Sequence, residues 1–356
     1  MHKIIKEVLE ELNKHGYQAY LVGGFVRDTL LGIKSYDVDI CTSALPKEVH
    51  AIFNMHSNNY GGANMTIGNY NFDITTFRKE SNYKNRKPEK IEYIDDLKTD
   101  LLRRDFTINT IVMDKYGKVI DLLNGIEDLN NRLIKMVGNP SKRIEEDPLR
   151  ILRAIRFATI LDFQIDGKLV EAIKEKKTLI NNLSKTRVRE ELDKILCNEN
   201  FKKGLNLLKD LGIAEVIGIS WNEINYIDDL MGMWSQIKFT NIPFTNNEKS
   251  NIIKITEVVN SGNVTSETLF KYGLYINTVA GMILNIDAKK INILYKKIPI
   301  KDKSDIDIKG NEIIELLNIL PGKIVSDIYD ELTTEILKGN LKNKKKFIKK
   351  FLLARK

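Results

Sequence analysis

The chain has 356 residues, of which 42% are hydrophobic, so it is long enough for a buried core and for more than one domain. Lys and Arg together (56) exceed Asp and Glu (48) by 8, which makes the chain net basic. A basic balance suggests a polyanionic partner, although a solvated lysine-rich surface would give the same numbers. Cys41 and Cys197 show no metal-binding spacing, and no signal peptide or membrane span is readable. We therefore expect a cytoplasmic protein with no membrane partner.

The first part of the chain alternates helices and strands. Apolar spacing predicts a helix over residues 3–14, and a short apolar run predicts a strand at 18–23. Gly23-Gly24 then turn the chain into a second helix, which ends near Gly32. Three further elements are predicted before residue 78: a strand at 36–43, a helix at 45–53 and a pair of strands at 65–77.

The polarity of the chain changes at residue 78. Residues 78–95, "RKESNYKNRKPEKIEYID", show neither a helical nor a strand period until their end, which predicts a mobile loop in their first part. A helix and a strand with a turn at Tyr116-Gly117 follow, and from about residue 126 the pattern is almost wholly helical. The last helix, "KNKKKFIKKFLLARK", is basic and amphipathic, so it could contact RNA phosphates or simply be solvated.

These patterns predict an α+β fold. A small N-terminal head with a mixed β-sheet and helices should be followed by an all-α neck, body and tail. The predicted boundaries are 1–125 for the head, 126–200 for the neck and 201–356 for the body and tail.

Two acids stand one residue apart in the apolar strand "YDVDICTS". Asp37 and Asp39 at positions i and i+2 place both carboxylates on one face of a strand, about 7 Å apart. Two unpaired carboxylates at this separation repel each other, so a cation between them is expected, and Mg²⁺ suits such hard oxygen ligands. The alternative is an exposed strand edge with two solvated acids.

The glycine turn before these acids favours the metal hypothesis. Backbone N–H groups at Gly23 and Gly24 can hold phosphate oxygens where a helix begins, and Arg27 adds a charged donor. Asp73, on a later predicted strand, offers a third acid that could complete a two-metal site. A phosphate-binding turn upstream of a metal-binding strand is the layout that nucleotidyl transfer requires.

A second constellation lies in "EEDPLRILRAIRFA". At about 100° per residue, Asp147, Arg150 and Arg153 fall on one side of the predicted helix, opposite a set of Ile and Leu residues. Arg156 falls near the margin between the two sides. An Asp/Arg stripe can hydrogen-bond the edge of a base, because a carboxylate only accepts and a guanidinium only donates. The alternative is an i, i+3 salt bridge between Asp147 and Arg150.

The motifs resemble a known family in order and spacing over residues 20–160. "GGFVRD" with "DVDICTS" resembles motif A of the class II tRNA nucleotidyltransferases, the CCA-adding enzymes, and of their relatives the bacterial poly(A) polymerases. "RRDFTINTI" resembles motif B, and "EEDPLRILRAIRFA" resembles the nucleotide-selecting Glu-Asp-x-x-Arg motif. The segment starting "DIDIKGNEIIELL" is similar, more faintly, to the tRNA-binding tail of that family.

The resemblance implies a role for each matched residue. Asp37 and Asp39 would be catalytic and hold the metal, and Asp105 would brace the site. The implied nucleotide-binding residues are Gly24, Arg27, Arg104, Asp147, Arg150, Arg153 and Arg156.

Three departures from the family pattern stand out. The usual "DPFGG" before the neck is "DLLNG" here, which keeps Asp121 and Gly125. Thr186 stands where the neck motif usually has Glu, so an ion pair of Arg187 is lost or re-made by Glu190. The third acid is Asp73, where Glu is as frequent.

The loop predicted after residue 78 bears on which nucleotides are added. Members of the family that add only CC tend to have this loop shortened, whereas here it is full-looking, polar and basic. Its length therefore favours an enzyme that adds the final A, although an ordinary surface loop would look the same.

The resemblance implies transfer of CMP and AMP from CTP and ATP to the 3′ end of tRNA, with Mg²⁺ and without a nucleic-acid template. The acceptor arm of tRNA is the expected partner, and no DNA partner is expected. The nearest alternatives are an enzyme that adds only the A and a bacterial poly(A) polymerase. A non-catalytic RNA-binding protein is a further alternative, in which both metal-binding acids would be superfluous.

Overall fold

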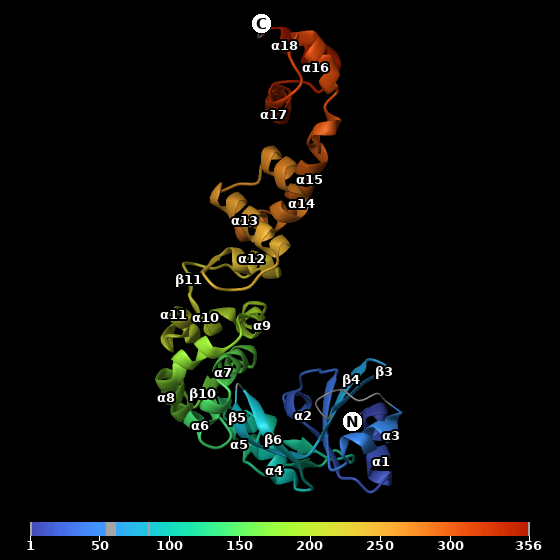
Figure 1. Ribbon diagram of the computed structural model, residues 1–356, viewed down its shortest axis with the longest axis vertical. Coiled ribbons are helices and arrows are strands. Elements are labelled where there is room, and N and C mark those ends of the chain that lie inside the picture. The colour runs from blue at the N-terminus through green and yellow to red at the C-terminus, as the bar shows by residue number, and fades with distance from the viewer. Residues whose placement is uncertain (1, 55–61, 85, 355–356) are drawn as a thin grey trace. The chain divides into compact units, whose positions relative to one another are not determined.

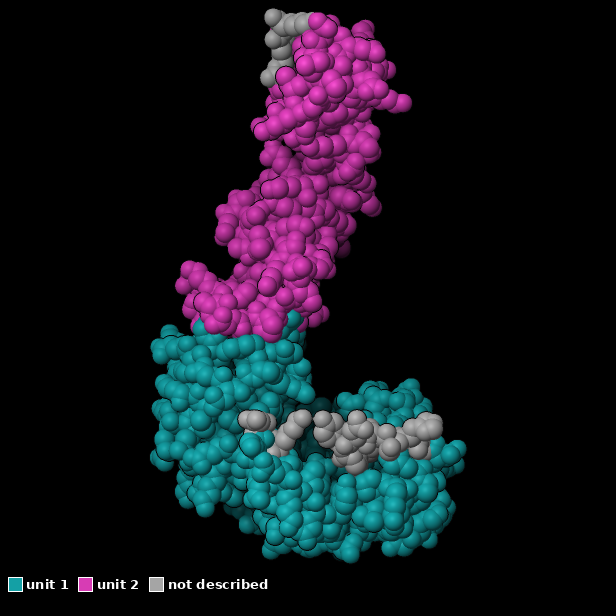
Figure 2. Space-filling model, in the orientation of Figure 1, with its two compact units in different colours: residues 1–218 teal, residues 219–356 magenta. Residues whose placement is uncertain are grey.

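The computed structural model describes residues 2–54, 62–84 and 86–354. The chain forms two compact units, residues 1–218 and 219–356 (Figure 2). Unit 1 holds a mixed sheet followed by helices, and unit 2 is mainly helical. The α+β fold is thereby confirmed, while the finer boundaries near residues 125 and 200 stay predictions.

A six-stranded sheet forms the head, with the strand order β3-β4-β2-β1-β7-β8. β2 and β4 run parallel, whereas every other neighbouring pair is antiparallel, so the sheet is mixed as predicted. The strands are β1 (Ala19–Val22), β2 (Asp37–Thr42), β3 (Gly62–Ile67), β4 (Tyr70–Thr76), β7 (Val112–Met113) and β8 (Val119–Ile120).

Three helices cover this sheet and match the predicted ones: α1 (Lys3–Lys14), α2 (Gly23–Leu30) and α3 (Pro46–Phe53). α1 and α3 lie on the opposite side of the sheet from α2 (Figure 1). Leu21, Ile40 and Ile74 are buried in neighbouring strands at matched positions of the register. This apolar face fixes the register, because a shift of one residue would expose it.

Residues 78–93 form a β-hairpin, so the predicted mobile loop is wrong for this stretch. β5 (Arg78–Lys84) and β6 (Lys87–Tyr93) pair antiparallel as a separate two-stranded sheet. The sequence does not predict this hairpin, because the inward-facing side chains of β5 are charged or hydroxylated and not apolar. They are Arg78, Glu80 and Tyr83. Alternation of apolar and polar residues, the usual strand signal, is therefore absent.

The rest of unit 1 is helical apart from two short strands, β9 (Leu133–Ile134) and β10 (Gln164–Ile165). Asp147 lies in extended conformation between two helices, and Pro148 follows it. The prediction of a single helix through Asp147 is thus wrong. Of the four residues in the predicted Asp/Arg stripe, only Arg150, Arg153 and Arg156 lie in α7. The helical elements are α4 (Leu97–Leu102), η1 (Thr107–Asn109), α5 (Gly125–Asn130), α6 (Pro140–Glu146), α7 (Leu149–Ile160), α8 (Gly167–Lys176), η2 (Lys177–Asn182), α9 (Lys185–Leu196), α10 (Phe201–Asp210) and α11 (Ile213–Ile217).

Unit 2 contains two short paired strands, β11 (Ile219–Trp221) and β12 (Ile237–Phe239), and otherwise helices. The basic amphipathic helix predicted at the end is α18, whose Ile348 and Leu352 are buried. Within the described part of the chain, no helix is both long and apolar enough to cross a membrane. The helical elements of unit 2 are α12 (Leu230–Ser235), α13 (Asn246–Asn260), α14 (Ser266–Ile283), α15 (Ala288–Lys297), η3 (Lys303–Asp305), α16 (Gly310–Leu317), α17 (Lys323–Leu337) and α18 (Lys345–Leu353).

Candidate active site

One cavity of about 710 Å³ in unit 1 gathers every residue that the sequence marked as catalytic or nucleotide-binding. It lies between the sheet of the head and helix α7, so residues more than a hundred positions apart face the same space. The predicted residues lining it are Gly24, Arg27, Asp37, Asp39, Arg104, Asp147, Arg150, Arg153 and Arg156. The other lining residues are Gly23, Asp105, Asn109, Phe157 and Lys194.

The two acids of β2 stand at the sheet end of this cavity. Val38 and Ile40 point into the core, so Asp37 and Asp39 share the opposite face. Gly23 has φ +71°, and a Cβ there would lie 2.7 Å from Asp39 Oδ2, so only glycine allows this close approach. The glycine turn and the Asp39 carboxylate are therefore in direct contact.

The electrostatics of Asp39 suit a bound cation. Burial raises the pKa of Asp39 above its ordinary value; Arg104 opposes this, and the nearby Asp73 and Asp37 carboxylates raise it further. The donor set consists of hard carboxylate oxygens, which fits Mg²⁺. Within the described residues, no group of three or more His, Cys, Asp or Glu side chains is arranged to hold a metal ion. Asp37 and Asp39 stay the predicted ligands. The role of Asp73 stays a prediction.

Arg27 reaches the cavity from α2 and is held on two sides. Its Nη1 donates to Asn109 Oδ1 at 2.7 Å, and its Nε donates to Asp28 Oδ1 at 2.8 Å. The guanidinium lies 5.0 Å from the centroid of the Phe157 ring, and those of Arg153 and Arg156 lie 5.5 and 4.4 Å from it. Three cations thus contact one aromatic ring, whose π face attracts each of them. Burial and the charges of Arg153 and Arg27 nevertheless lower the pKa of Arg156 below its ordinary value.

Sequence reasoning missed Phe157 and Asn109. Phe157 was passed over as an ordinary apolar residue of the helix, although its i, i+4 spacing from Arg153 places the two side by side. Asn109 gave no signal, since a lone asparagine after "RRDFT" is as common in turns as in sites.

Asp105 braces the site, as the resemblance implied. Its carboxylate accepts hydrogen bonds from Arg153 Nε at 2.9 Å, from Asn109 Nδ2 at 3.0 Å and from the Phe106 N–H at 2.8 Å. Burial alone would raise the pKa of Asp105, but the Arg153 guanidinium and these hydrogen bonds lower it well below the ordinary range. Since Asn109 also binds Arg27, one chain of contacts connects the head to α7.

Asp147 and Arg150 are engaged by different partners, not by the salt bridge that was the alternative. Asp147 Oδ1 accepts from Arg86 Nε of the hairpin turn at 2.6 Å. Arg150 Nη1 donates to the carbonyl of Arg143 at 2.6 Å and to Glu146 Oε2 at 3.0 Å. The carboxylate and the guanidinium are therefore each held by partners outside the pair, and both line the cavity.

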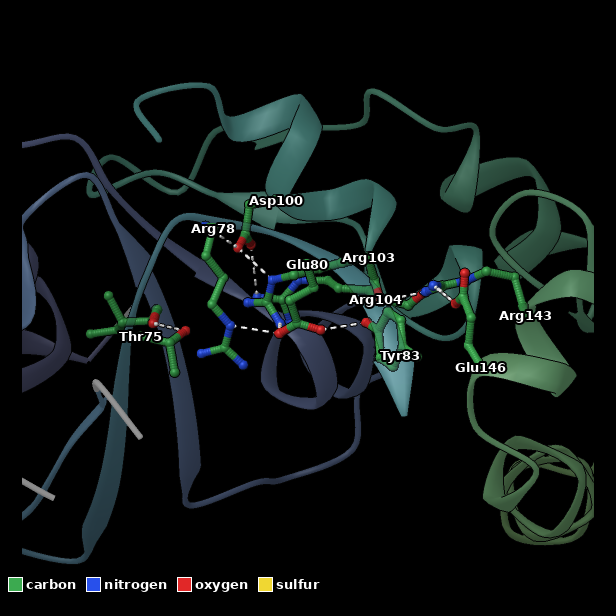
Figure 3. A network of polar contacts seen from close by, with 10 residues as sticks. Thr75, Arg78, Glu80, Tyr83, Asp100, Arg103, Arg104, Arg143 and Glu146 are labelled. Atoms are coloured by element: carbon green, nitrogen blue, oxygen red, sulfur yellow. Dashed lines mark hydrogen bonds and ion pairs between the residues drawn. The ribbon is translucent and has the colours of Figure 1, made fainter. Parts of the chain in front are cut away.

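A polar network fastens the hairpin to the site (Figure 3). Glu80 of β5 accepts from Arg78 Nε at 2.6 Å and from Tyr83 Oη at 2.5 Å, and lies 3.5 Å from Arg103 Nη1. Arg103 Nε also donates to the fully buried Asp100, at 2.8 Å. The hairpin is thus anchored at its base by the residue that precedes Arg104.

The same network continues into α6. Arg143 is buried, and its Nη2 donates to the backbone carbonyls of Arg103 and Arg104, the latter at 2.7 Å. Its Nη1 donates to Glu146, which in turn binds Arg150. Neither Arg143 nor Asp100 was singled out in the sequence, because nothing in their spacing distinguishes them from surface charges.

The structure shows which contacts form at two of the places where the sequence departs from the family pattern, near Thr186 and in the "DLLNG" turn. Arg187 Nη1 binds Glu190 Oε2 at 2.9 Å, so the pair that Thr186 cannot make is re-made as proposed. The next residue of α9, Glu191, forms a buried ion pair with Arg156, in which Glu191 Oε2 lies 3.2 Å from Arg156 Nε. No sequence pattern indicated this pair. Asp121 accepts from the N–H groups of Gly125 and Ile126, both at 2.9 Å, which holds the "DLLNG" turn.

An acid pair beside a glycine turn, facing an arginine-lined cavity, defines the class of nucleotidyltransferases. Family models match three segments: "Poly A polymerase head domain" over residues 19–135, "Probable RNA and SrmB- binding site of polymerase A" over 162–218, and "tRNA nucleotidyltransferase domain 2 putative" over 239–352.

Curated relatives match over nearly the whole chain. CCA-adding enzymes from Ligilactobacillus salivarius and Limosilactobacillus reuteri are each 33% identical, with 96% and 95% of this chain and 93% of each relative covered. The Bacillus stearothermophilus CCA-adding enzyme in complex with CTP superposes with a TM-score of 0.81 at 26% identity, over 99% of this chain and 96% of that one. The chain therefore belongs to the family of CCA-adding enzymes.

The buried Asp105 gives a prediction for stability. Asp105→Asn removes the charge from three hydrogen bonds, so we expect the free energy of unfolding to fall by about 2 kcal/mol at pH 7. The folded-state pKa is lowered, so this stabilisation is present in full above the pKa of an unfolded Asp, about 3.9, starts to decrease below it, and is lost only as the pH falls through the lowered folded-state pKa. Urea unfolding of both proteins at pH 7 and pH 3 measures the difference; an equal difference at both pH values would contradict the account.

Proposed function

We propose that this chain is a CCA-adding tRNA nucleotidyltransferase, which transfers CMP and AMP from CTP and ATP to the 3′ end of tRNA without a nucleic-acid template and releases diphosphate. The observation that carries the proposal is that the acid pair and the Asp147/Arg150 pair line one cavity. Chemistry and base choice can therefore act on the same bound nucleotide. The likeness to CCA-adding enzymes over the whole chain supports it.

In this proposal Asp37 and Asp39 hold Mg²⁺, which would activate the attacking hydroxyl and neutralise the triphosphate. Gly24 offers a backbone N–H, and Arg27 and Arg104 offer guanidinium donors to the phosphate oxygens. Asn109 and Phe157 orient Arg27, so its donors are positioned before the nucleotide arrives. Arg153 and Arg156 line the same cavity from α7 and add positive charge.

Base choice is assigned to Asp147 and Arg150. Asp147 accepts from the exocyclic amino group of cytosine or adenine, and Arg150 donates to the ring nitrogen beside it. Uracil and guanine place a carbonyl against the carboxylate, which costs roughly 1–3 kcal/mol in unpaired groups. Because Arg86 contacts Asp147 Oδ1, an incoming base must displace that contact or share the carboxylate with it.

The acceptor arm of tRNA is the proposed macromolecular partner, bound by the helical parts through phosphates and shape rather than sequence. Cys41 and Cys197 remain thiols, which fits the cytoplasm as the proposed location. An enzyme that adds only the A, or a poly(A) polymerase, would share the acid pair and the base-reading pair. Acceptors of different length separate these possibilities.

The first prediction concerns activity itself. With Mg²⁺, CTP and ATP, tRNA transcripts ending in the discriminator base, in C and in CC should all be completed to CCA and then stop. Asp37→Ala and Asp39→Ala should each lose nucleotide incorporation by a factor of about 10³ or more, because the metal ligands are removed. Both variants should still bind tRNA in a gel-shift assay. Extension of CC-ended tRNA alone, or an unlimited A tail, would contradict the proposal.

The second prediction concerns nucleotide choice. Exchanging Asp147 and Arg150 for residues with the opposite hydrogen-bonding character should lower the kcat/KM for CTP and ATP relative to UTP and GTP by at least about tenfold. Arg187→Ala, in an exposed ion pair of the neck, serves as a control with unchanged selection. If the variant substituted at Asp147 and Arg150 kept the wild-type preference for CTP and ATP, these residues would not be the ones that read the base.

The third prediction concerns the hairpin. Replacing residues 82–89 with a two-residue turn removes Arg86 but keeps the Glu80–Arg103 contact at the hairpin base. We expect the addition of C to persist and the addition of the terminal A to fall strongly, because the resemblance implies that family members with this loop shortened add only CC. Single-nucleotide extension of C-ended and CC-ended tRNA measures the two rates. An equal loss of both, or of neither, would rule out this role.

A further inference from the structure

A second cavity adjoins the acid pair. It has a volume of about 430 Å³ and lies along strands β2, β3 and β4. Asp37 and Asp39 line both this cavity and the nucleotide cavity, so the acid pair stands between the two. The remaining residues lining it are Val38, Asn64, Met65, Thr66, Asn71, Phe72 and Asp73.

Strand register explains why this cavity is polar. Asn64, Asp73 and Asp39 are direct neighbours across three strands, and Thr66, Asn71 and Asp37 form the next such row on the same face. The row between them, Met65, Phe72 and Val38, turns to the opposite face, where Phe72 and Val38 are buried. Two rows of hydrogen-bonding side chains therefore end at the two acids.

The second row forms a chain of hydrogen bonds. Thr66 Oγ1 donates to Asn71 Oδ1 at 3.0 Å, and Asn71 Nδ2 donates to Asp37 Oδ1 at 3.1 Å. These bonds fix the orientation of the Asn71 amide, whose remaining N–H points away from Asp37. Thr66, Asn71 and Asp37 are all exposed, so a ligand can reach each of them.

The two cavities differ in charge. Among the described residues, five arginines line the nucleotide cavity, whereas the second cavity is lined by acids, amides, a hydroxyl and apolar side chains and by no Lys or Arg. A triphosphate belongs among the arginines. Neutral donors and acceptors beside carboxylates suit hydroxyl groups, such as those of a ribose.

Reaction geometry points the same way. In phosphoryl transfer the attacking and leaving oxygens lie roughly in line, on opposite sides of the phosphorus. If the diphosphate is held by Arg27 and its neighbours, the attacking hydroxyl must approach from the other side of the acid pair. The second cavity occupies that side, since it shares the acids and none of the arginines.

We propose that the face formed by Asn64, Thr66, Asn71 and Asp37 is the subsite for the terminal ribose of the RNA acceptor. Asn71 is a positioning residue for Asp37 and, with Asn64, binds the 2′-hydroxyl beside the attacking 3′-hydroxyl. This inference rests on the proposed nucleotidyl transfer and adds a source of preference for RNA over DNA at the acceptor end.

The test compares acceptors that end in a ribose or in a 2′-deoxyribose. For each protein, the ratio of kcat/KM for the two acceptors is measured with CTP and Mg²⁺ on otherwise identical tRNA transcripts. The wild-type ratio should be about five to ten, the effect of one hydrogen bond in an ordered site. In Asn71→Ala and Asn64→Ala it should fall toward one. The KM for CTP should stay within about twofold of the wild-type value.

Two further variants sharpen the comparison. Asn69→Ala removes the same amide from the turn between β3 and β4, outside the cavity lining, and should keep the wild-type ratio. Thr66→Val preserves shape while removing the hydrogen bond to Asn71, so it should lower the ratio even if Asn71→Ala fails to fold.

The outcomes separate the two levels of the account. An unchanged ratio in Asn71→Ala, Asn64→Ala and Thr66→Val, with extension of the ribose-ended acceptor intact, would overturn the subsite alone. A rise in the KM for CTP that matches the loss on the acceptor would also overturn it, because the face would then serve the nucleotide cavity. A wild-type protein that extends neither acceptor would overturn the proposed function and the subsite together.

Discussion

Separation of charge inside one cavity is the constraint on which the rest of the structure depends. Asp37 and Asp39 face a space lined by five arginines, yet the ion pairs of this region use other carboxylates. Arg153 pairs with Asp105 and Arg156 with Glu191. If these arginines collapsed onto the β2 acids, the site would neutralise itself. Keeping them apart preserves a negative end for a cation and a positive wall for a polyanion.

The supporting contacts belong to segments far apart in the chain. The Arg153–Asp105–Asn109–Arg27 contacts join α7 to the head, and the Arg143 guanidinium joins α6 to the backbone that carries Arg104. The hairpin adds contacts at both of its ends, with Glu80 near Arg103 and Arg86 at Asp147. Such a network is costly if only partly satisfied, so it favours one arrangement of the site. In the proposed function, the choice of nucleotide thereby depends on residues that do not touch the acid pair.

Sequence alone predicted the mixed sheet, the acid pair and the arginine stripe because each leaves a local pattern. Gly23-Gly24 before a helix, Asp37 and Asp39 at i, i+2, and arginines at i, i+3 are all readable within a few residues. The hairpin after residue 78 was not readable, because its strands pack through ion pairs and not through an apolar face. Asp147 was misplaced inside a helix because the extended residue before Pro148 interrupts a strong apolar period. Partners such as Arg143 and Glu191 acquire their role only from the tertiary fold.

The central claim is that a single cavity accepts both cytosine and adenine nucleotides, with base choice made by Asp147 and Arg150. Equilibrium binding of labelled CTP, titrated with unlabelled ATP in the presence of Mg²⁺ and without tRNA, so that no transfer can occur, tests this claim most directly. The account predicts one nucleotide bound per chain and complete displacement of CTP by ATP. Simultaneous binding of CTP and ATP to one chain would contradict it.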